Sequence, residues 1–597
     1  MTVRFVFGVH MHQPVGNFDH VFEEHTRDVY LPFLKRLAER EFFPVVMHLS
    51  GPLMEWLDRA HSSYLDMVGE LASQGRIEML LSGYYEPILA ALPRDDRVEQ
   101  IQWMQRAIES RFGVKASGLW LTERVWEPEL PADLNAAGVR YVLVDDRHFL
   151  VTGFNREQLH VPWRTESDGK SVDVLAIDER LRYLIPFRPP SEIEEYFHEL
   201  NDAGHRIALF ADDGEKFGGW PGTREWVYDK GWLTRFLDSI EKLVSSGIVT
   251  MSTASYALDE VAGGGIAYLP TASYREMEGW SLPASGAIKL ADLEKKLGTD
   301  NPFVRGSHWK NFLAKYPESN RAHKKMLALS ALCRRRGDPE AARRAVGRAQ
   351  CNDAYWHGVF GGLYLPHLRE GIWKNLAVAE RELRQGEPLD IEILDFDLDG
   401  TNEAWIHSSH FSAIIKNGWI VEYTIFTSEL NYADVLTRRF EAYHQLEEHP
   451  EPAQHETDEG VPSIHHLEES MRLRERPPVD DHDRAMFFDS MATDSFEVTG
   501  PSEVTCRGRG VEKRYHFFDT GEITVTWMWK HQQFFSTEIS STRELNIVAT
   551  PPARQTVMPV ETVAKSEKGF DRTVQGQSVT LEWDGSLGRA EVRIRPY

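Results

Sequence analysis

The chain is poor in cysteine. Among 597 residues it contains only Cys333, Cys351 and Cys506, and no two of them form a CxxC pair. A scattered, odd-numbered set of this kind excludes a disulfide framework and a cysteine zinc site. It is typical of reduced thiols, so we expect a cytoplasmic protein.

Long apolar runs and positive charge are also scarce. No run approaches the roughly 18 apolar residues of a membrane span, and the N-terminus carries no charged leader with a cleavage site. Lys and Arg number 67 against 92 Asp and Glu, which gives a net charge of −25. An acidic surface repels phosphate backbones and anionic lipid, so nucleic-acid and membrane partners are disfavoured. A neutral or cationic substrate fits better.

What the chain does contain is the composition of a globular protein with a large core: 42% hydrophobic and 27% charged residues. Through the first 260 residues, short apolar runs alternate with amphipathic segments, which indicates parallel βαβ units. About seven units in succession predict a closed or nearly closed (β/α) barrel. The runs are Phe5–Val9, Val45–Leu49, Ile77–Leu81, Leu119–Leu121, Tyr141–Val144, Ile207–Ala211 and Val249–Met251.

The pattern changes twice further along the chain. Helical spacing dominates Asn320–Arg336 and Gly371–Gln385, whereas short alternating strands such as Trp419–Phe426 follow Pro388 and predict a β-sandwich. We therefore predict a barrel over 1–290, a helical domain that completes the active site over 291–386, and a sandwich over 387–597. A stretch near 449–483 that is rich in Pro, Glu and His predicts a long exposed loop.

In a barrel of parallel strands, reactive groups lie at the carboxyl ends of the strands. Carboxylates, imidazoles and tryptophans gather at these positions. This combination is typical of a sugar site, because Trp faces stack on pyranose rings and carboxylates bind hydroxyls or transfer protons. The residues at or just after the strand ends are His10, His12, Trp120, Glu123, Arg124, Asp213 and Trp220.

Several of these segments resemble the signature motifs of glycoside hydrolase family 57, and they are most like those of its 4-α-glucanotransferases. They are His10-Met-His-Gln-Pro14, Trp120-Leu-Thr-Glu-Arg-Val-Trp126 and Asp212-Asp-Gly-Glu-Lys-Phe-Gly218, with further likeness at 309–312, 316–320 and 351–358. The resemblance is strong over roughly residues 1–385, and the C-terminal part diverges. It implies a (β/α)7 barrel, a retaining mechanism, a nucleophile at Glu123, an acid/base at Asp213 and no organic cofactor for catalysis.

The residues themselves suit such chemistry. A retaining glycosidase needs two carboxyl groups about 5–5.5 Å apart, one ionised and one protonated. Arg124 favours the ionised form of Glu123 if their side chains converge, and the apolar run before Asp213 favours a raised pKa. Asp212 and Asp213 point to opposite faces of an extended strand, so only one enters the site, and the resemblance selects Asp213. The alternative is that the carboxylates cap helices.

His10 and His12 lie on one face of the first strand, because they are two residues apart. We expect them to bind glucosyl hydroxyls and to orient Glu123. The alternatives are core histidines or the first two ligands of a metal-dependent hydrolase. Glu78 lies inside an apolar strand and needs a partner, either His10 or a sugar hydroxyl in the site, or a structural ion pair with Arg76.

Trp120, Trp220 and Trp356 are candidate stacking platforms, with a place in the core as the alternative for each. The resemblance adds Trp280 and Asp353 to the predicted substrate-binding residues.

An acidic segment in the predicted sandwich resembles the first half of a calcium-binding EF-hand loop. Asp residues alternate and a Gly follows them, but Ile406 occupies the position of the usual bidentate glutamate, which excludes a true EF-hand. We predict either a structural Ca²⁺ site or a solvated acidic turn on a β-hairpin. The candidate ligands are Asp395, Asp397, Asp399 and Glu403.

Taken together, the sequence predicts a 4-α-glucanotransferase that acts on α-1,4-glucans and maltooligosaccharides. The alternatives are an α-amylase-type hydrolase, a metal-dependent polysaccharide hydrolase or deacetylase that uses His10 and His12, and a non-catalytic glucan-binding protein. The last is disfavoured, because binding alone gives no reason for a carboxylate pair at the strand ends. The sequence leaves open whether the chain forms a homo-oligomer.

Overall fold

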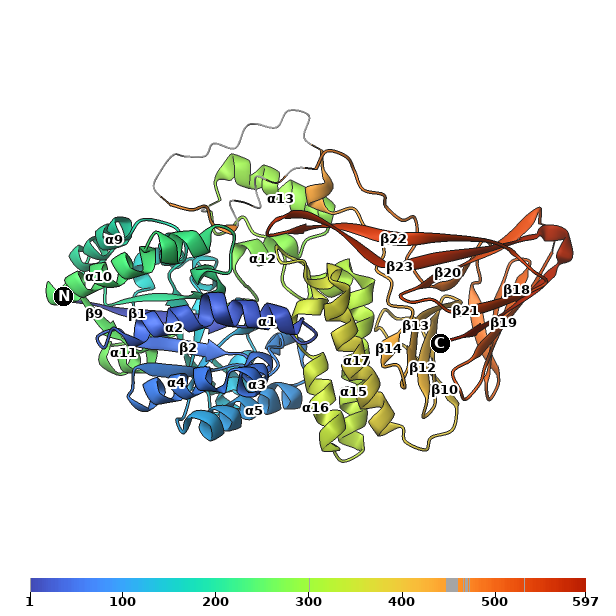
Figure 1. Ribbon diagram of the computed structural model, residues 1–597, viewed down its shortest axis with the longest axis horizontal. Helices are drawn as coiled ribbons and strands as arrows, with labels where there is room; N and C mark the ends of the chain where they lie inside the picture. The colour runs from blue at the N-terminus through green and yellow to red at the C-terminus, as the bar shows by residue number, and fades with distance from the viewer. Residues whose placement is uncertain are drawn as a thin grey trace.

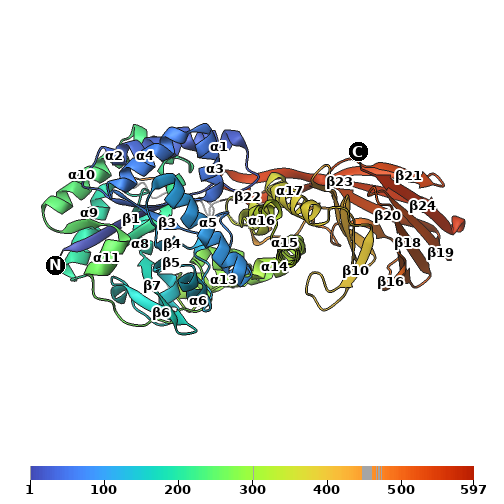
Figure 2. The same cartoon turned by 90° about the horizontal axis from the view of Figure 1, so that it is seen from below.

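The structure is a computed structural model that describes residues 2–299, 301–446, 460–464, 467, 471, 473–530 and 532–596. The molecule is elongated, with a barrel at the N-terminal end, helices in the middle and antiparallel sheets at the other end (Figures 1 and 2). This is the fold class that the sequence predicts. Within the described residues, no helix has both the length and the apolar character needed to cross a membrane.

Seven parallel strands form the barrel in the order β8-β1-β2-β3-β4-β5-β7. The outer strands β7 and β8 do not pair as a ladder among the described strands, and a hydrogen bond of 2.8 Å from Asp178 N to Leu209 O links them. The barrel is therefore closed with a seam between β7 and β8. Its strands are β1 (Val3–Met11), β2 (Val45–Leu49), β3 (Ile77–Leu81), β4 (Gly118–Trp120), β5 (Tyr141–Asp145), β7 (Lys170–Ile177) and β8 (Ile207–Asp213).

The seventh strand is not the one that the sequence predicts. Val249–Met251 becomes β9 (Val249–Ser252), which pairs only with Val3–Val6 at the start of β1. The seventh barrel strand is instead β7. Its first residues are exposed and polar, and they pair with the antiparallel β6 (Trp163–Ser167) in a half-exposed hairpin. Because β7 begins with polar residues, its sequence lacks the continuous apolar run that identifies the other barrel strands.

Helices cover the outside of the barrel, and α11 (Ala254–Glu260) closes its floor. Ala254 and Ala257 pack against the inward side chains of Val6, Leu80 and Leu209. The remaining helices of this region are α1 (Asp19–His25), α2 (Leu31–Ala38), α3 (Gly51–Ala60), α4 (Ser62–Ser73), α5 (Arg94–Phe112), α6 (Leu130–Ala136), α7 (Arg147–Leu150), α8 (Glu179–Leu184), α9 (Pro190–Asp202), α10 (Trp232–Ser245), α12 (Arg275–Trp280) and α13 (Ala284–Leu297).

The middle region is helical, as predicted, although α13 runs across the boundary predicted at residue 290. Its helices are α14 (Asn311–Lys315), α15 (Pro317–Arg335), α16 (Glu340–Ala349) and α17 (Pro366–Leu383). A buried ion cluster joins this region to the next, because Lys325 on α15 contacts Glu380 on α17 at 2.7 Å and Glu422 on β13 (Trp419–Ile425) at 2.9 Å.

The C-terminal region is the predicted β-sandwich. One antiparallel sheet contains β10 (Asp390–Leu394), β11 (Glu403–His407), β12 (Phe411–Lys416), β13, β14 (Leu430–Asn431), β15 (Met486–Asp489), β20 (Phe534–Ser541), β22 (Arg554–Ser566) and β23 (Gly569–Asp584). The other contains β16 (Ser495–Gly500), β17 (Glu503–Gly508), β18 (Val511–Phe517), β19 (Ile523–Trp529), β21 (Asn546–Thr550) and β24 (Arg589–Arg595). Their facing side chains, such as Trp527, Phe535 and Tyr515, form one core.

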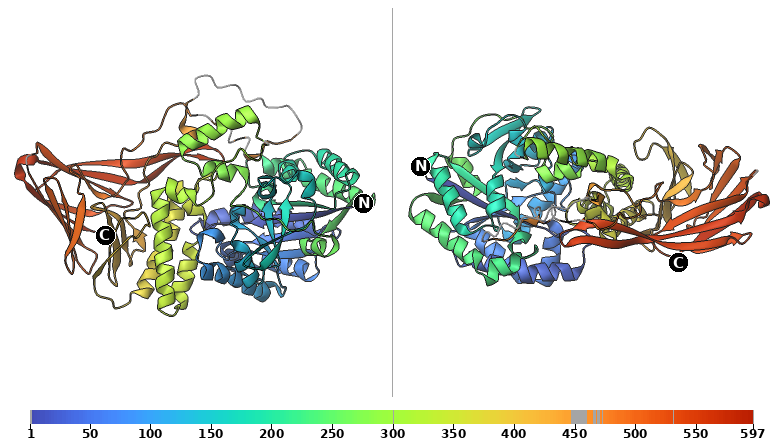
Figure 3. Two further views of the ribbon diagram at one scale, coloured as in Figure 1. Left: turned by 180° about the vertical axis from the view of Figure 1, so that it is seen from behind. Right: turned by 90° about the horizontal axis from the view of Figure 1, so that it is seen from above.

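Two parts of the sandwich approach the barrel. The β22–β23 hairpin extends over the middle helices, as Figure 1 and the view from above in Figure 3 show. The chain between β14 and β15 also crosses to the barrel, where Val461 N donates to Phe187 O at 3.0 Å. The loop predicted near 449–483 lies partly outside the described residues, and its described stretch 473–483 contains no helix or strand.

Candidate active site

Glu123 lies in a strained turn just past β4. The turn is η3 (Thr122–Arg124), in which Glu123 and Arg124 both adopt left-handed backbone angles, with φ of 52° and 51°. Such angles are costly for residues other than glycine and persist where the surroundings enforce them, often at functional sites. Here the hydroxyl of Ser273 donates to Glu123 O at 2.5 Å, and Tyr274 donates to Glu123 Oε2 at 2.7 Å. The carboxylate is therefore held in one orientation.

Arg124 packs against Tyr274, the residue that binds the Glu123 carboxylate. Its guanidinium lies over the ring of Tyr274 at 4.5 Å and over that of Trp120 at 5.7 Å. Burial raises the pKa of Glu123, while the hydrogen bond from Tyr274 and the charge of Arg124 act in the opposite direction. Arg124 therefore lowers the pKa of Glu123, as predicted, but burial raises it by more.

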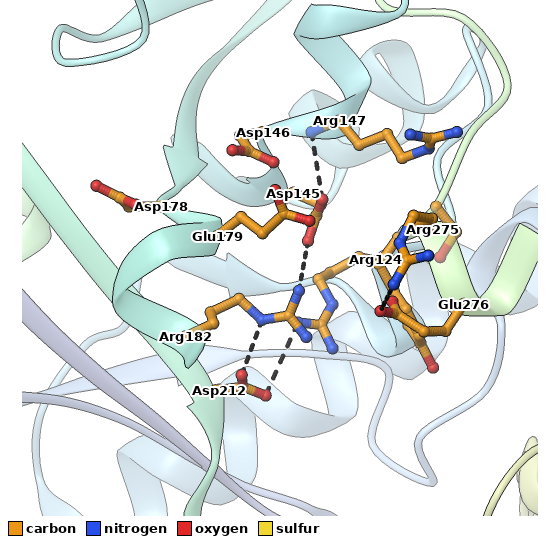
Figure 4. Close-up of polar contacts among 12 residues, drawn as sticks. Arg124, Asp145, Asp146, Arg147, Asp178, Glu179, Arg182, Asp212, Arg275 and Glu276 are labelled. Carbon is orange, nitrogen blue, oxygen red and sulfur yellow. Dashed lines mark hydrogen bonds and ion pairs between the residues drawn. The ribbon is translucent and has the colours of Figure 1, made fainter. Parts of the chain in front are cut away.

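The side chains of Asp212 and Asp213 have different surroundings, as strand alternation predicts. Asp212 Oδ2 accepts from Arg182 Nε at 2.8 Å and from Lys216, and Arg182 also pairs with Asp145 at 3.0 Å (Figure 4). Burial alone would raise the pKa of Asp212, but these cations lower it well below its usual range. Asp212 is therefore an ionised structural carboxylate.

Asp213 has different surroundings from Asp212. It stands opposite His10 in the β1–β8 register, and burial together with the charges of Asp212 and Glu215 raises its pKa to about 8. The charge of Glu123 also raises this pKa. Asp213 precedes η5 (Gly214–Phe217) but its side chain makes no capping hydrogen bond. For Asp213, the helix-capping alternative is excluded.

His10 and His12 have opposite environments although their rings stack 5.7 Å apart. Burial alone would lower the pKa of His12, but the charge of Asp353 and its hydrogen bond, 3.1 Å from His12 Nε2, raise the pKa to about 9. Burial and the neighbouring His48 lower the pKa of His10, whose ring stacks on Trp120 at 4.6 Å. His12 is therefore the cationic member of the pair, and Asp353 is its counter-ion.

Among the described residues, three groups of side chains have metal-ligand composition, and two of them include a predicted histidine. In the first, Nδ1 of His10 and Nδ1 of His48 are hydrogen-bonded to each other at 2.7 Å. In the second, His12 and the thiol of Cys351 both bond to Asp353, the thiol at 3.2 Å. These bonds do not test the metal-dependent alternative, which stays a prediction.

Glu86 belongs to the site but was not among the predicted residues. It is 1% exposed and has a left-handed φ of 54°. Thr122 Oγ1 donates to Glu86 Oε1 at 2.9 Å, and Oε2 lies 3.6 Å from His48 Nε2. Burial raises its pKa to about 7. Its position after β3 is the signal that sequence reasoning overlooked, whereas Tyr274 follows no strand pattern that would have revealed it.

Glu215 is a second overlooked carboxylate. It follows Asp213 by two residues, and its Oε1 accepts from Tyr30 Oη at 2.5 Å and from His12 N at 3.2 Å. The bond from His12 N links the ends of the neighbouring strands β1 and β8.

The structure does not bring Glu78 into this site. Glu78 is aligned with Val46 on β2, on the floor side of the rim residues. It accepts from Tyr141 Oη at 2.7 Å and from Ser255 N at 3.1 Å, the latter in the first turn of α11, where a carboxylate is favoured. Its partners are thus neither His10 nor Arg76.

The tryptophans divide into two kinds. Trp280 and Trp356 are half-buried and stack at 6.1 Å with 23° between their planes. Trp120 is buried behind His10, and Trp220 is 7% exposed in a cluster with Phe187 and the sandwich residue Ile464. Trp280 and Trp356 have the exposure that a stacking platform needs, whereas Trp120 and Trp220 are largely covered.

The acidic loop of the sandwich lies between β10 and β11, on the predicted hairpin. Lys416 bonds to Asp397, to Asp399 at 2.5 Å and to Glu403 at 3.3 Å. Asp395 accepts from the backbone N of Asp399 and Gly400, each at 3.0 Å. As arranged, these residues do not fit a calcium ion, because the Lys416 ammonium occupies the position between Asp397, Asp399 and Glu403 that an ion would take. Calcium binding stays a prediction that requires Lys416 to move away.

Comparison with family models gives three matches along the chain. Residues 6–270 match the model described as glycosyl hydrolase family 57. Residues 307–383 match the middle domain of α-amylase/4-α-glucanotransferase, and residues 395–511 and 528–594 match the C-terminal domain of the same description.

Individual proteins give a consistent picture. The chain is 47% identical over 475 residues to an α-amylase of Pyrococcus abyssi, covering 78% of this chain and 71% of that one. It is 46% identical over 475 residues to a 4-α-glucanotransferase of Thermococcus litoralis, covering 78% and 70%. The crystal structure of 4-α-glucanotransferase from Thermococcus litoralis superposes with a TM-score of 0.87 at 36% identity, over 100% of both chains.

Proposed function

The chain belongs to glycosyl hydrolase family 57, and from this premise we propose that it is a retaining 4-α-glucanotransferase with Glu123 as nucleophile and Asp213 as acid/base. The enzyme cleaves an α-1,4-glucan, holds the glycosyl segment covalently on Glu123, and passes it to the 4-hydroxyl of another glucan. The uncharged substrate suits a chain whose net charge is −25.

One observation supports the proposal: two buried carboxyls lie at the carboxyl ends of the barrel strands β4 and β8, and they differ in surroundings. Asp213, with a pKa of about 8, is protonated at neutral pH and gives its proton to the glycosidic oxygen while Glu123 attacks the anomeric carbon. The Asp213 carboxylate then takes the proton of the acceptor hydroxyl, which attacks the same carbon and frees Glu123. Tyr274 keeps the other oxygen of Glu123 in place through both steps.

Neighbouring groups bind the sugar. The cationic His12, with its counter-ion Asp353, supplies a charged hydrogen-bond donor at the rim, and Trp280 and Trp356 supply a stacking surface. Because Asp353, Trp280 and Trp356 belong to the middle region or to its junction with the barrel, the helical domain completes the active site.

An α-amylase-type hydrolase is the second candidate, favoured by the relatives that carry that name. Transfer and hydrolysis use the same two carboxyls and differ in whether sugar or water reaches the covalent intermediate first. Incubation with maltotriose, followed by chromatography, separates them. We expect glucose together with a series of longer maltooligosaccharides, whereas maltose and glucose alone would indicate a hydrolase.

We also propose that the protein works in the cytoplasm. Its three cysteines are all buried and unpaired, which suits a reducing compartment. Titration of the denatured, unreduced protein with a thiol reagent should find three thiols, and fewer would contradict the proposal.

A further inference from the structure

A cavity of about 770 Å³ lies at the seam of the barrel, where β7 and β8 part. Ala176 and Ile177 of β7 and Ile207 and Leu209 of β8 line it, and the ends of α8 and α9 complete its wall. We call it the seam cavity. Its volume falls within the roughly 300–1,000 Å³ of pockets that hold small molecules.

The seam cavity is separate from the active site. Arg182 pairs with both Asp145 and Asp212, so buried ion pairs link the end of β5 to the end of β8 (Figure 4). The next residue, Asp146, lines the cavity instead. None of the residues assigned to catalysis or sugar binding above lines this cavity.

The lining suits a neutral ligand rich in hydroxyl groups. Five acidic and four arginine side chains surround an apolar floor, so neither a cation nor an anion is strongly selected, while donors and acceptors for hydroxyls are abundant. The charged residues are Asp146, Glu157, Asp178, Glu179, Glu199, Arg147, Arg156, Arg180 and Arg275.

Asp146 supplies a second, independent observation. Its residue is 3% exposed, and while Oδ2 bonds to Arg156, Oδ1 has no hydrogen-bond partner among the described residues. Buried polar atoms without a partner are rare, because the lost hydrogen bond to water is not replaced. Burial and the neighbouring Asp145 also raise the pKa of Asp146. A hydroxyl group both donates and accepts, so it bonds to the acid and to the carboxylate alike.

We propose that the seam cavity is a second saccharide-binding site, which holds a short stretch of α-glucan against Asp146 and Arg156. The choice of an α-glucan rests on the proposed function. A glucan anchored there raises the effective concentration of its chain near the active site, so the site acts on long substrates and not on maltotriose.

Ala203 offers a way to fill the cavity without disturbing the core. It is exposed at the end of α9 and lines the cavity, so Ala203→Trp obstructs it. Ala136→Trp, at an exposed position of α6 outside the lining, is the matched control. Both changes are made in the Glu123→Gln background, which binds but does not turn over substrate, and in the active enzyme.

Calorimetric titration with maltoheptaose, raised to millimolar concentration, tests the proposal. We expect two sites per chain in Glu123→Gln and in its Ala136→Trp derivative, and one site after Ala203→Trp, with maltotriose turnover unchanged in the active Ala203→Trp enzyme. A single site in all three proteins would overturn the second site and leave the proposed function standing. Absence of maltoheptaose binding in all three, with no turnover by the parent enzyme, would instead contradict the proposed function.

Discussion

At Asp213 the protonation state depends on negative neighbours as well as on burial. Glu215 and Asp212 both raise its pKa, and Asp212 cannot be replaced without breaking the ion pairs with Arg182 and Lys216. Glu215 bonds to Tyr30 and to a backbone amide, both of which a glutamine oxygen can accept from. Glu215 is therefore the position at which the charge can be removed with least structural change.

Glu215→Gln should move the alkaline limb of the pH profile to lower pH. The general acid is protonated below its pKa of about 8, so kcat/KM falls as pH rises through that value. Removing the Glu215 charge favours ionised Asp213 and lowers its pKa, so the fall begins earlier. The measurement is kcat/KM for maltotriose against pH, with an unchanged alkaline limb as the contradicting result.

The residue scale also shows what sequence can predict of a site. Glu123, Arg124, Asp213 and the two histidines follow apolar runs, and the structure brings them together. Glu86 was passed over although it follows β3, whereas Tyr274 was missed because its role depends on a long-range contact with Glu123. Glu78 was misplaced for the same reason, since its strand position does not say which end of the barrel its carboxylate serves.

At the scale of elements, we predict that Trp356 contributes to substrate binding and that Trp220 contributes to packing. Trp356→Ala should lower kcat/KM for maltotriose by an amount that corresponds to a loss of about 1–3 kcal/mol in transition-state stabilisation, by analogy with base stacking. The melting temperature should change little, because Trp356 is half-buried beside Trp280. Trp220→Ala should cost about 3–5 kcal/mol of stability, because Trp220 is buried against Phe187 and Ile464. Kinetics and thermal melts of both variants, with Trp→Phe at each position as control, provide the check. Equal effects on kinetics and stability in the two variants would contradict this division.

The β10–β11 hairpin allows a test of the calcium prediction. If calcium binds, the melting temperature must rise with free calcium, because the ion stabilises the folded state that binds it. Since the Lys416 ammonium already occupies the position between the carboxylates, we expect nearly equal melting temperatures in EDTA and in millimolar calcium for the parent, and a calcium-dependent rise only after Lys416→Met. A rise of the same size in both proteins would show that Lys416 does not compete with the ion.

Elements were predicted best where one physical pattern dominates. The buried strands β1, β2, β3, β5 and β8 and the long helices α15 and α17 have clear periodicity, and their predicted bounds lie within a few residues of the observed ones. The strand β7 was missed because its polar half belongs to a hairpin with β6, and that pairing leaves no periodic signal.

At the scale of the whole molecule, the middle helices and the sandwich share a buried charge cluster. Lys325→Met leaves Glu422 without its cation and should destabilise the protein by about 3–5 kcal/mol. The double variant Lys325→Met/Glu422→Leu should recover most of that loss, because Glu380 keeps Arg384 at 2.9 Å. Chemical denaturation of both variants measures the difference, and equal stability of the two would contradict a role for the unpaired carboxylate.

The order of barrel, helical region and sandwich could be predicted because each has its own pattern of apolar residues. The contacts between these three regions could not be predicted. Nothing local in the sequence says that Val461 and Ile464 of the sandwich region reach Phe187 and Trp220 of the barrel. Such contacts depend on how the folded domains meet.

The central claim is that Glu123 carries the glycosyl group and Asp213 moves the proton. Reaction of an activated α-glycosyl fluoride with azide tests both roles at once, because fluoride leaves without an acid. With Glu123→Gly, azide takes the place of the missing nucleophile and the product should be the β-glycosyl azide. With Asp213→Ala, azide instead attacks the covalent intermediate on Glu123 and the product should be the α-glycosyl azide. An α-azide from Glu123→Gly, or wild-type turnover without azide, would contradict the account.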